Sequence, residues 1–372
     1  GTLKRFLKYK SKKENTMERC SKMKKMYIMM AFSLIRLFFI PQSTQAATVK
    51  RPSQVTGLNV KLTAKNTAKL TWKKAGNAKQ YQVYCSVNKG NYKKIKTTKA
   101  TSFTQKKLKN GAIYVYKVRG LNQKKTGNYS SVQRIRTISA ANPGLSVSAK
   151  GVAATLGWKK ITNATGYYVY RAGANGSWNK IATTKERSYV VKGLQLGGSY
   201  TYKVIPYLSA NGKTFKGSSS SKKLIMPTSG WLVDYVQPYR TSTGYVNCNT
   251  KKFSMSGKNY THGFTTTGRG LTKKDIYFNL GGKYSTLQFK AGICDEPKWS
   301  LYQNGRVKIY DGTKLLKQIE IKDFSVPEYT VDIKGCTNLK IEVSQLIKIS
   351  GQNVDTDLTN TRYGFADVKL TK

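Results

Sequence analysis

A long internal repeat constrains the fold of this 372-residue chain more than any other feature. Residues 69–121 and 155–207 align without a gap at an offset of 86 residues, so that Trp72 matches Trp158. A repeat of this length is a whole domain that has been duplicated, because the units of solenoids and similar arrays are only about 20 to 50 residues long. The sequence therefore predicts two consecutive domains with the same fold.

Within each copy, apolar residues alternate with polar ones. In the segment YQVYCSV, Tyr81, Val83 and Cys85 fall on one side of an extended chain. Alternation over short runs, interrupted about every eight to twelve residues by Gly, Asn and Lys turns, is typical of an antiparallel sandwich. Trp72 and Trp158 lie in such runs, so we expect them in the two cores rather than in a ligand site.

Three sequence marks occur in both copies: a tryptophan in the second strand, YQVY or YYVY in the third, and a Leu-x-x-Gly-x-x-Tyr spacing. This spacing comprises Leu108, Gly111 and Tyr114 in the first copy and Leu194, Gly197 and Tyr200 in the second. With these marks the copies resemble fibronectin type III domains. The resemblance implies immunoglobulin-like sandwiches over residues 51–138 and 139–227, and a tyrosine corner in which the hydroxyl ties a turn to the backbone. It also implies a role as spacers or adhesive units.

The first 47 residues have the layout of a leader and signal peptide. A basic stretch containing Lys22, Lys24 and Lys25 precedes an apolar run over residues 26–40, and Pro41 and small residues follow. The run is shorter than the ~20 residues that a membrane-spanning helix needs. We therefore expect an extracellular protein, secreted or associated with the cell wall, with no transmembrane span after signal cleavage. A buried N-terminal helix or an uncleaved anchor is the alternative.

The chain carries a formal charge of +51, from 67 basic and 16 acidic residues. Such an excess predicts anionic partners. For a secreted protein these are anionic cell-wall polymers, and we expect no nucleic-acid partner. The cysteines after the leader lie far apart without a C-x-x-C motif, which predicts no zinc site; they are Cys85, Cys248, Cys294 and Cys336. One disulfide among the last three and buried free thiols both remain open.

Residues 228–372 differ in composition but keep the β pattern. They contain alternating runs such as TLQFKAGI and LKIEVSQ, and Asp311 with Gly312 is typical of a hairpin turn. About eight strands result, enough for a jelly-roll sandwich. The predicted fold class of the whole chain is therefore all-β, with two immunoglobulin-like sandwiches and a C-terminal jelly roll.

This last segment is similar to the NPCBM family, a carbohydrate-binding module of secreted bacterial glycosidases and surface proteins. The similarity rests on NYTHGFTTTG, IYFNLGGKYSTLQFKAGICDE, GRVKIYDGTKLL, VDIKGCTNLKIEV and GFADVKL, in this order. Thr267 stands where the family usually has a histidine, Arg362 and Tyr363 lie where another is expected, and Phe365 replaces a usual tryptophan. The resemblance implies sugar binding, but these departures leave the sugar undefined.

Sugar binding requires an aromatic ring for the apolar face of the sugar and a few hydrogen-bonding groups. The segment DEPKWSLYQNG offers Trp299, Tyr302 and Asn304 between two strands. The predicted carbohydrate-binding residues are Trp299, Tyr302, Asn304, Asp295, Glu296, Thr267, Arg362 and Tyr363. For Asp295 and Glu296, loop solvation or backbone capping is the alternative to a ligand or calcium role.

Oxygen ligands for calcium occur at Asp355 and Asp357, a weak motif without the EF-hand pattern; apart from calcium we expect no cofactor. His262, the single histidine, has no carboxylate or nucleophile beside it in sequence, so we interpret it as a loop residue rather than a catalyst. The sequence thus predicts a secreted, non-catalytic glycan-binding protein. Two alternatives are a divergent glycoside hydrolase, which needs two carboxylates facing one bond, and a purely structural adhesin without a sugar site.

Overall fold

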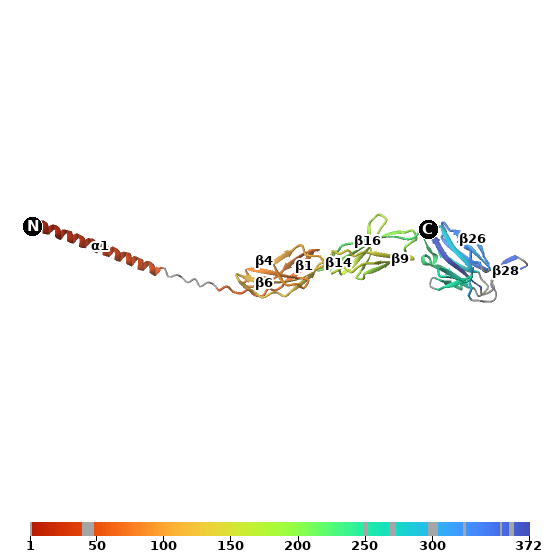
Figure 1. Cartoon of the computed structure of the whole chain (residues 1–372), viewed down its shortest axis with the longest axis horizontal. Helices are drawn as coiled ribbons and strands as arrows, with labels where there is room; N and C mark the ends of the chain where they lie inside the picture. The colour runs from red at the N-terminus through yellow and green to blue at the C-terminus, as the bar shows by residue number, and fades with distance from the viewer. Residues whose placement is uncertain are drawn as a thin grey trace.

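The computed structural model describes residues 2–38, 48–248, 251–267, 273–296, 304–322, 325–349, 352–356 and 361–372. Helix α1 (Thr2–Phe38) is followed by three β-modules arranged end to end (Figure 1). The side chains of residues 2–30 are exposed, which excludes a buried N-terminal helix for that stretch. None of the helices in the described ranges is long and apolar enough to cross a membrane.

The first module consists of two antiparallel sheets. One has the order β1-β2-β5 and the other the order β4-β3-β6-β7, with β8 also paired to β6. The strands are β1 (Asn59–Ala64), β2 (Thr67–Thr71), β3 (Gln80–Val87), β4 (Lys93–Thr98), β5 (Ser102–Gln105), β6 (Ile113–Asn122), β7 (Lys125–Thr126) and β8 (Gln133–Arg136).

The second module repeats this arrangement, with sheets ordered β13-β10-β9 and β12-β11-β14-β15 and with β16 paired to β14. The strands are β9 (Ser146–Lys150), β10 (Ala153–Gly157), β11 (Gly166–Ala172), β12 (Trp178–Thr184), β13 (Ser188–Val191), β14 (Ser199–Ala210), β15 (Lys213–Lys216) and β16 (Ser220–Ile225). The two predicted sandwiches are confirmed.

The duplication extends to individual side-chain contacts. Trp72 and Trp158 are buried, with 6% and 7% of their surface exposed. Each packs against the equivalent tyrosine, Tyr81 at 5.6 Å and Tyr167 at 5.5 Å between ring centroids. Both tryptophans are therefore core residues, as their place in an alternating run predicts.

The tyrosine corner is present in both modules. The hydroxyl of Tyr114 accepts a hydrogen bond from the backbone N–H of Lys109 at 2.6 Å, and that of Tyr200 accepts one from Gln195 at 2.9 Å. Donor and acceptor lie five residues apart in each case. The contact closes the turn before the long central strand, and it confirms the interpretation of the Leu-x-x-Gly-x-x-Tyr spacing.

The connection between the two modules is packed and hydrogen-bonded. Ile138 is completely buried at the junction. The N–H of Ser139 donates to the carbonyl of Thr162 at 3.1 Å, and the Asn163 amide donates to the carbonyl of Thr137 at 2.9 Å. These contacts join the end of the first module to a loop of the second.

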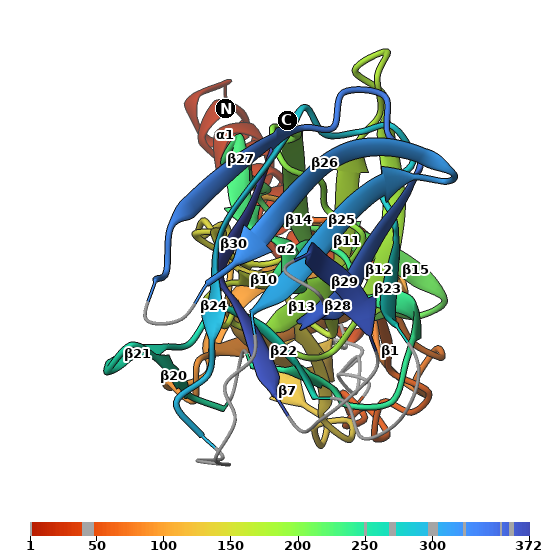
Figure 2. The same ribbon diagram turned by 90° about the vertical axis from the view of Figure 1, so that its right-hand side faces the viewer.

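The third module is a sandwich of two six-stranded antiparallel sheets around an aromatic core (Figure 2). The first sheet has the order β19-β22-β30-β24-β27, with β17 beside β30, and the second has the order β18-β23-β28-β25-β26, with β29 beside β28. Phe264 of the first sheet contacts Phe365 of the same sheet and Phe278 of the second. The predicted jelly-roll class is confirmed.

The first sheet comprises β17 (Ser229–Trp231), β19 (Tyr245–Asn247), β22 (Gly263–Thr267), β24 (Thr286–Ile293), β27 (Glu328–Asp332) and β30 (Arg362–Thr371). The second comprises β18 (Pro238–Thr241), β23 (Lys274–Asn279), β25 (Gly305–Asp311), β26 (Lys314–Ile321), β28 (Asn338–Ile349) and β29 (Gln352–Thr356). A hairpin of β20 (Phe253–Met255) and β21 (Lys258–Tyr260) and the one-turn helix α2 (Leu232–Tyr235) complete the module. Strands of three to five residues are too short to show alternation, so the sequence predicts fewer strands than the structure contains.

Candidate functional site

Several predicted site residues meet at one end of the C-terminal sandwich. Thr267, the last residue of β22, pairs with Arg362, the first residue of β30. Tyr363 pairs with Ile293 at the end of β24, and Asn304 immediately precedes β25. Because neighbouring antiparallel strands begin and end at this edge, residues nearly 100 positions apart lie together.

Tyr363, one of the predicted carbohydrate-binding residues, is a core residue rather than an exposed ligand. It lies in β30 with 5% of its surface exposed, and its ring fills the space above Gly305, where a Cβ would lie 2.5 Å from the ring. Both faces of β30 are covered here: the main core lies on one side and the β20–β21 hairpin packs on Ala366 on the other. The Tyr363 side chain therefore packs beneath the candidate site, inside the sandwich.

The hydroxyl of Tyr363 donates to the backbone carbonyl of Asn304 at 3.3 Å. The same carbonyl accepts a hydrogen bond from the N–H of Leu346 in β28 at 2.7 Å. These contacts hold Asn304, which follows segment 297–303 with its aromatic residues Trp299 and Tyr302. Both aromatic residues lie outside the described residues.

Asp295 holds the other end of this segment. Its carboxylate accepts a hydrogen bond from the N–H of Gly257 at 2.9 Å, and its own N–H donates to the carbonyl of Ser254 at 2.9 Å. Gly257 and Ser256 form the tip of the β20–β21 hairpin with positive φ angles of 76° and 50°. Of the two alternatives for Asp295, the structure shows backbone capping, while the neighbouring Glu296 is exposed.

Arg362 lies half-buried between the site and a small apolar cluster. Its Nε donates to the hydroxyl of Thr265 at 3.0 Å. Burial raises the pKa of the Cys294 thiol to about 12 and also raises the pKa of Cys248, although the nearby Arg362 charge opposes both shifts. All cysteines of the chain are free. Of the two alternatives, a disulfide or buried free thiols, the structure shows buried free thiols for the cysteines after the leader.

The calcium hypothesis gains no geometric support. Asp355 lies in β29 opposite Leu346, and Asp357 lies outside the described residues. Among the residues that the structure describes, no three His, Cys, Asp or Glu side chains gather in a way that could hold a metal ion.

His262 lies away from this end. Its ring stacks on Trp231 with centroids 4.7 Å apart, and its Nδ1 lies 3.1 Å from the hydroxyl of Thr261. Its carbonyl accepts a hydrogen bond from Val368, towards the opposite end of β30. Both contacts fit a loop residue that covers a partly exposed tryptophan.

A cluster of charged residues on the outer side of the second sheet is absent from the sequence prediction. Asp275 and Glu342 are direct cross-strand neighbours, and Lys340 lies between them, 3.5 Å from Asp275 and 2.8 Å from Glu342. Burial by itself raises the pKa of Glu342, but the hydrogen bond and charge of Lys340, with Lys273 and Lys308, lower it below its ordinary value. The alternation of LKIEV places Lys340 and Glu342 on one face, a signal that could have identified this pair.

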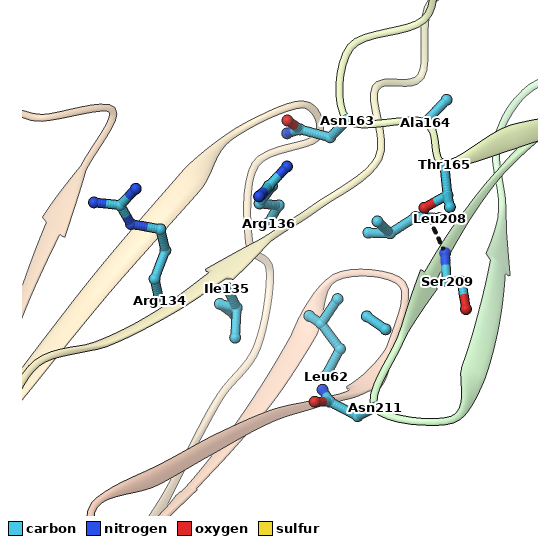
Figure 3. Close-up of a pocket in the computed structure, with 11 residues that line it drawn as sticks. Leu62, Arg134, Ile135, Arg136, Asn163, Ala164, Thr165, Leu208, Ser209 and Asn211 are labelled. Carbon is cyan, nitrogen blue, oxygen red and sulfur yellow. Dashed lines mark hydrogen bonds between the residues drawn. The ribbon is translucent and has the colours of Figure 1, made fainter. Parts of the chain in front are cut away.

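A cavity of about 420 Å³ lies between the two N-terminal modules (Figure 3). Asn163 binds Thr137 across the junction, and the hydroxyl of Thr165 accepts the N–H of Ser209 within the second module at 3.0 Å. Leu62 and Leu208 supply apolar walls from the two modules. The cavity is therefore a seam between packed modules.

Comparison with known proteins identifies the first module. The model of the "PBP1-like, fibronectin3-like domain" family matches residues 56–131. These residues form a fibronectin type III-like domain. No curated protein matches the chain.

Solved structures with similar folds include a two-domain fibronectin type III segment of chicken tenascin, with 18% identity over 46% of this chain and 99% of that chain and a TM-score of 0.28. The FN1–FN3 domains of chicken CNTN1 have 14% identity over 83% and 98% of the two chains, with a TM-score of 0.29. The CBM51-2 and INT domains of Clostridium perfringens ZmpB, in complex with GlcNAc, have 15% identity over 49% and 38%, with a TM-score of 0.31.

Proposed function

We propose that this chain is a secreted or cell-wall-associated protein without catalytic activity, whose NPCBM-like C-terminal module binds glycan. The observation that carries the proposal is the convergence at one end of the sandwich. There the ends of β22, β24 and β30 and the start of β25 bring Thr267, Arg362 and Asn304 together. Polar residues at neighbouring strand ends, together with a sequence segment that contains two aromatic residues, match what sugar recognition requires.

The proposed site divides its residues into contacts and supports. Trp299 and Tyr302 supply rings for the apolar face of the sugar, and the exposed Glu296 supplies hydrogen bonds. Asp295 and Tyr363 do not touch the ligand. Asp295 is hydrogen-bonded to the β20–β21 hairpin and Tyr363 to the carbonyl of Asn304, so the two residues lie on either side of segment 297–303 in the sequence.

The charged cluster on the second sheet favours binding over glycoside hydrolysis. A general acid in a glycosidase has a raised pKa, so that it is protonated at the working pH. Glu342 has a lowered pKa, and both it and Asp275 are ion-paired with Lys340. Glu342 therefore lacks the raised pKa that the general acid of a glycosidase needs.

The proposal is tested with the full chain on a glycan array that includes GlcNAc-terminated chains, followed by calorimetric titration of the glycans that bind. A Trp299→Ala variant should lose affinity by about tenfold or more, because aromatic stacking provides about 1–3 kcal/mol. Tyr239→Ala is the matched control, since Tyr239 is a 59% exposed aromatic residue near the other end of the module. Absence of glycan binding, with or without calcium, would favour the purely structural adhesin, and release of reducing sugar would favour the hydrolase.

A further inference from the structure

The larger sheet of the first module holds positive charges at defined positions on its outer face. The Nζ of Lys117 lies 4.0 Å from the ring centroids of both Tyr92 and Tyr129. Arg119, two residues further along β6, lies 5.0 Å from Tyr129 and 5.2 Å from Tyr84. Cations at these distances are attracted to the ring faces, so these side chains are restrained rather than free in solvent.

The second module repeats the lysine and one of its two rings at equivalent positions, whereas Arg119 corresponds to Ile205. Lys203, which matches Lys117 at the repeat offset, lies 3.8 Å from Trp178, which matches Tyr92, and 5.5 Å from Tyr170. Lys180 and Lys216 lie 5.1 Å and 5.9 Å from Tyr168 on this sheet. The duplicated modules have thus kept a lysine held between two rings at a surface position, where folding does not demand one.

These cations have no acidic counterparts. Residues 51–227 contain 34 basic residues and a single acidic one, Glu186. No carboxylate among the described residues forms an ion pair with Lys117, Arg119 or Lys203. The pKa of Lys203 is lowered, first by burial and then by the charge of Lys216. Mutual repulsion of this kind is relieved when an anion binds.

The first face continues to the seam between the modules. Arg134 and Arg136 of β8 pair with Val115 and Ile113 of β6, which places both arginines on the same side of the sheet as Lys117. Both are exposed and stand beside the interdomain cavity (Figure 3). The junction is packed at Ile138 and hydrogen-bonded, so the two basic faces belong to modules that are in direct contact.

We propose that these two faces together bind a linear polysaccharide that carries a carboxylate or phosphate on its repeating units. The proposal deepens the envelope association proposed above and rests on it. Repeated charges on one chain match two equivalent cationic faces, and the second contact then forms at high effective concentration. Stacking of nucleobases needs free ring faces, whereas here lysine and arginine already cover them, which favours a polysaccharide over a nucleic acid.

The test measures binding of the full chain to polygalacturonate, with its fully methyl-esterified form as the neutral ligand and single-stranded DNA as the competing polyanion. The double variant Lys117→Met/Lys203→Met should bind polygalacturonate at least about fivefold more weakly, since each charge-assisted contact contributes on the order of 1 kcal/mol. Lys61→Met/Lys69→Met is the control, because these exposed lysines lie on the smaller sheet of the first module. The control should change affinity by less than about twofold, and Lys117→Arg/Lys203→Arg should retain it.

Equal weakening in the control, equal binding of the methyl ester, or tighter binding of DNA through the same two lysines would each overturn the proposal. Unchanged melting temperatures exclude unfolding as the cause, and the arginine variant keeps the test valid if methionine disturbs the fold. Trp299→Ala should leave polygalacturonate binding unchanged, and the methionine pair should leave binding of neutral glycans unchanged. Failure of this proposal and failure of the C-terminal glycan site are therefore distinguishable.

Discussion

Two buried hydroxyl groups, at Tyr81 and Tyr167, should contribute more to stability than the tyrosine corners do. The Tyr81 hydroxyl accepts the N–H of Ala75 at 3.0 Å, and the Tyr167 hydroxyl accepts the N–H of Ile161 at 3.0 Å, both within the protein interior. The corresponding bond of Tyr200 lies at the surface. Substitution of tyrosine by phenylalanine therefore removes the same kind of hydrogen bond from a buried environment in one case and from a solvent-exposed environment in the other.

The expected loss of stability depends on whether the N–H that loses its acceptor is buried or can bind water. In Tyr81→Phe the N–H of Ala75 stays buried without an acceptor, which costs about 1–3 kcal/mol. In Tyr200→Phe water can replace the hydroxyl, so we expect a loss below about 1 kcal/mol. For a module of roughly 90 residues, a loss of about 2 kcal/mol corresponds to a fall in Tm of about 10 °C.

Differential scanning calorimetry of the full chain measures these shifts. Tyr81→Phe should lower the transition of the first module and Tyr167→Phe that of the second, by similar amounts, which also assigns the transitions. Tyr200→Phe is the matched control. If Tyr81→Phe costs no more than Tyr200→Phe, water reaches the Ala75 amide and the reasoning from burial fails.

Three further predictions concern the C-terminal module. Asp295→Ala should destabilise the module by about 1 kcal/mol, because the N–H of Gly257 loses its acceptor, and it should leave glycan affinity unchanged. Urea unfolding measures the change in stability and calorimetric titration measures the affinity. A loss of affinity without a loss of stability would instead indicate that Asp295 contacts the ligand. Gly364→Ala should cost about 1–3 kcal/mol in urea unfolding, because its Cβ would lie 2.6 Å from a buried aromatic carbon, and an unchanged midpoint would contradict this. Glu342→Gln should destabilise the protein at pH 7, because the pKa of Glu342 is lower in the folded than in the unfolded state. The difference in stability between Glu342→Gln and the parent protein should therefore disappear as the pH falls from about 4.3 through the folded-state pKa. A stability difference that persists at about pH 2 would exclude the ion pair with Lys340 as its source.

Much of the N-terminal fold could be predicted because its signals are local. The alternation around Tyr81 and the spacing that ends at Tyr114 reflect contacts within a strand or across one turn. A repeat at a fixed offset adds a second, independent copy of every such signal. The hydrogen bonds of Lys109 with Tyr114 and of Gln195 with Tyr200 show how closely the copies agree.

The candidate site was less predictable. The sequence allows Asp295 to be a ligand or a backbone cap, and its cap partner, Gly257, lies 38 residues away. The sequence makes Tyr363 a candidate sugar-binding residue, whereas the structure buries it. Neither outcome follows from sequence spacing. The cap on Gly257 depends on the β20–β21 hairpin, and the burial of Tyr363 depends on β25 of the opposite sheet, where its ring lies above Gly305.

The sequence by itself determined the duplication, the β class of each module and the excess of positive charge, because period-two alternation and composition require no knowledge of long-range contacts. Only the tertiary structure decided which strand ends meet, which aromatic rings are buried, and which lysines are held between rings on one face. These properties arise from pairing between strands far apart in the chain. The burial of a side chain is set by what packs against its own face of the strand, and its sequence neighbours do not reveal that partner.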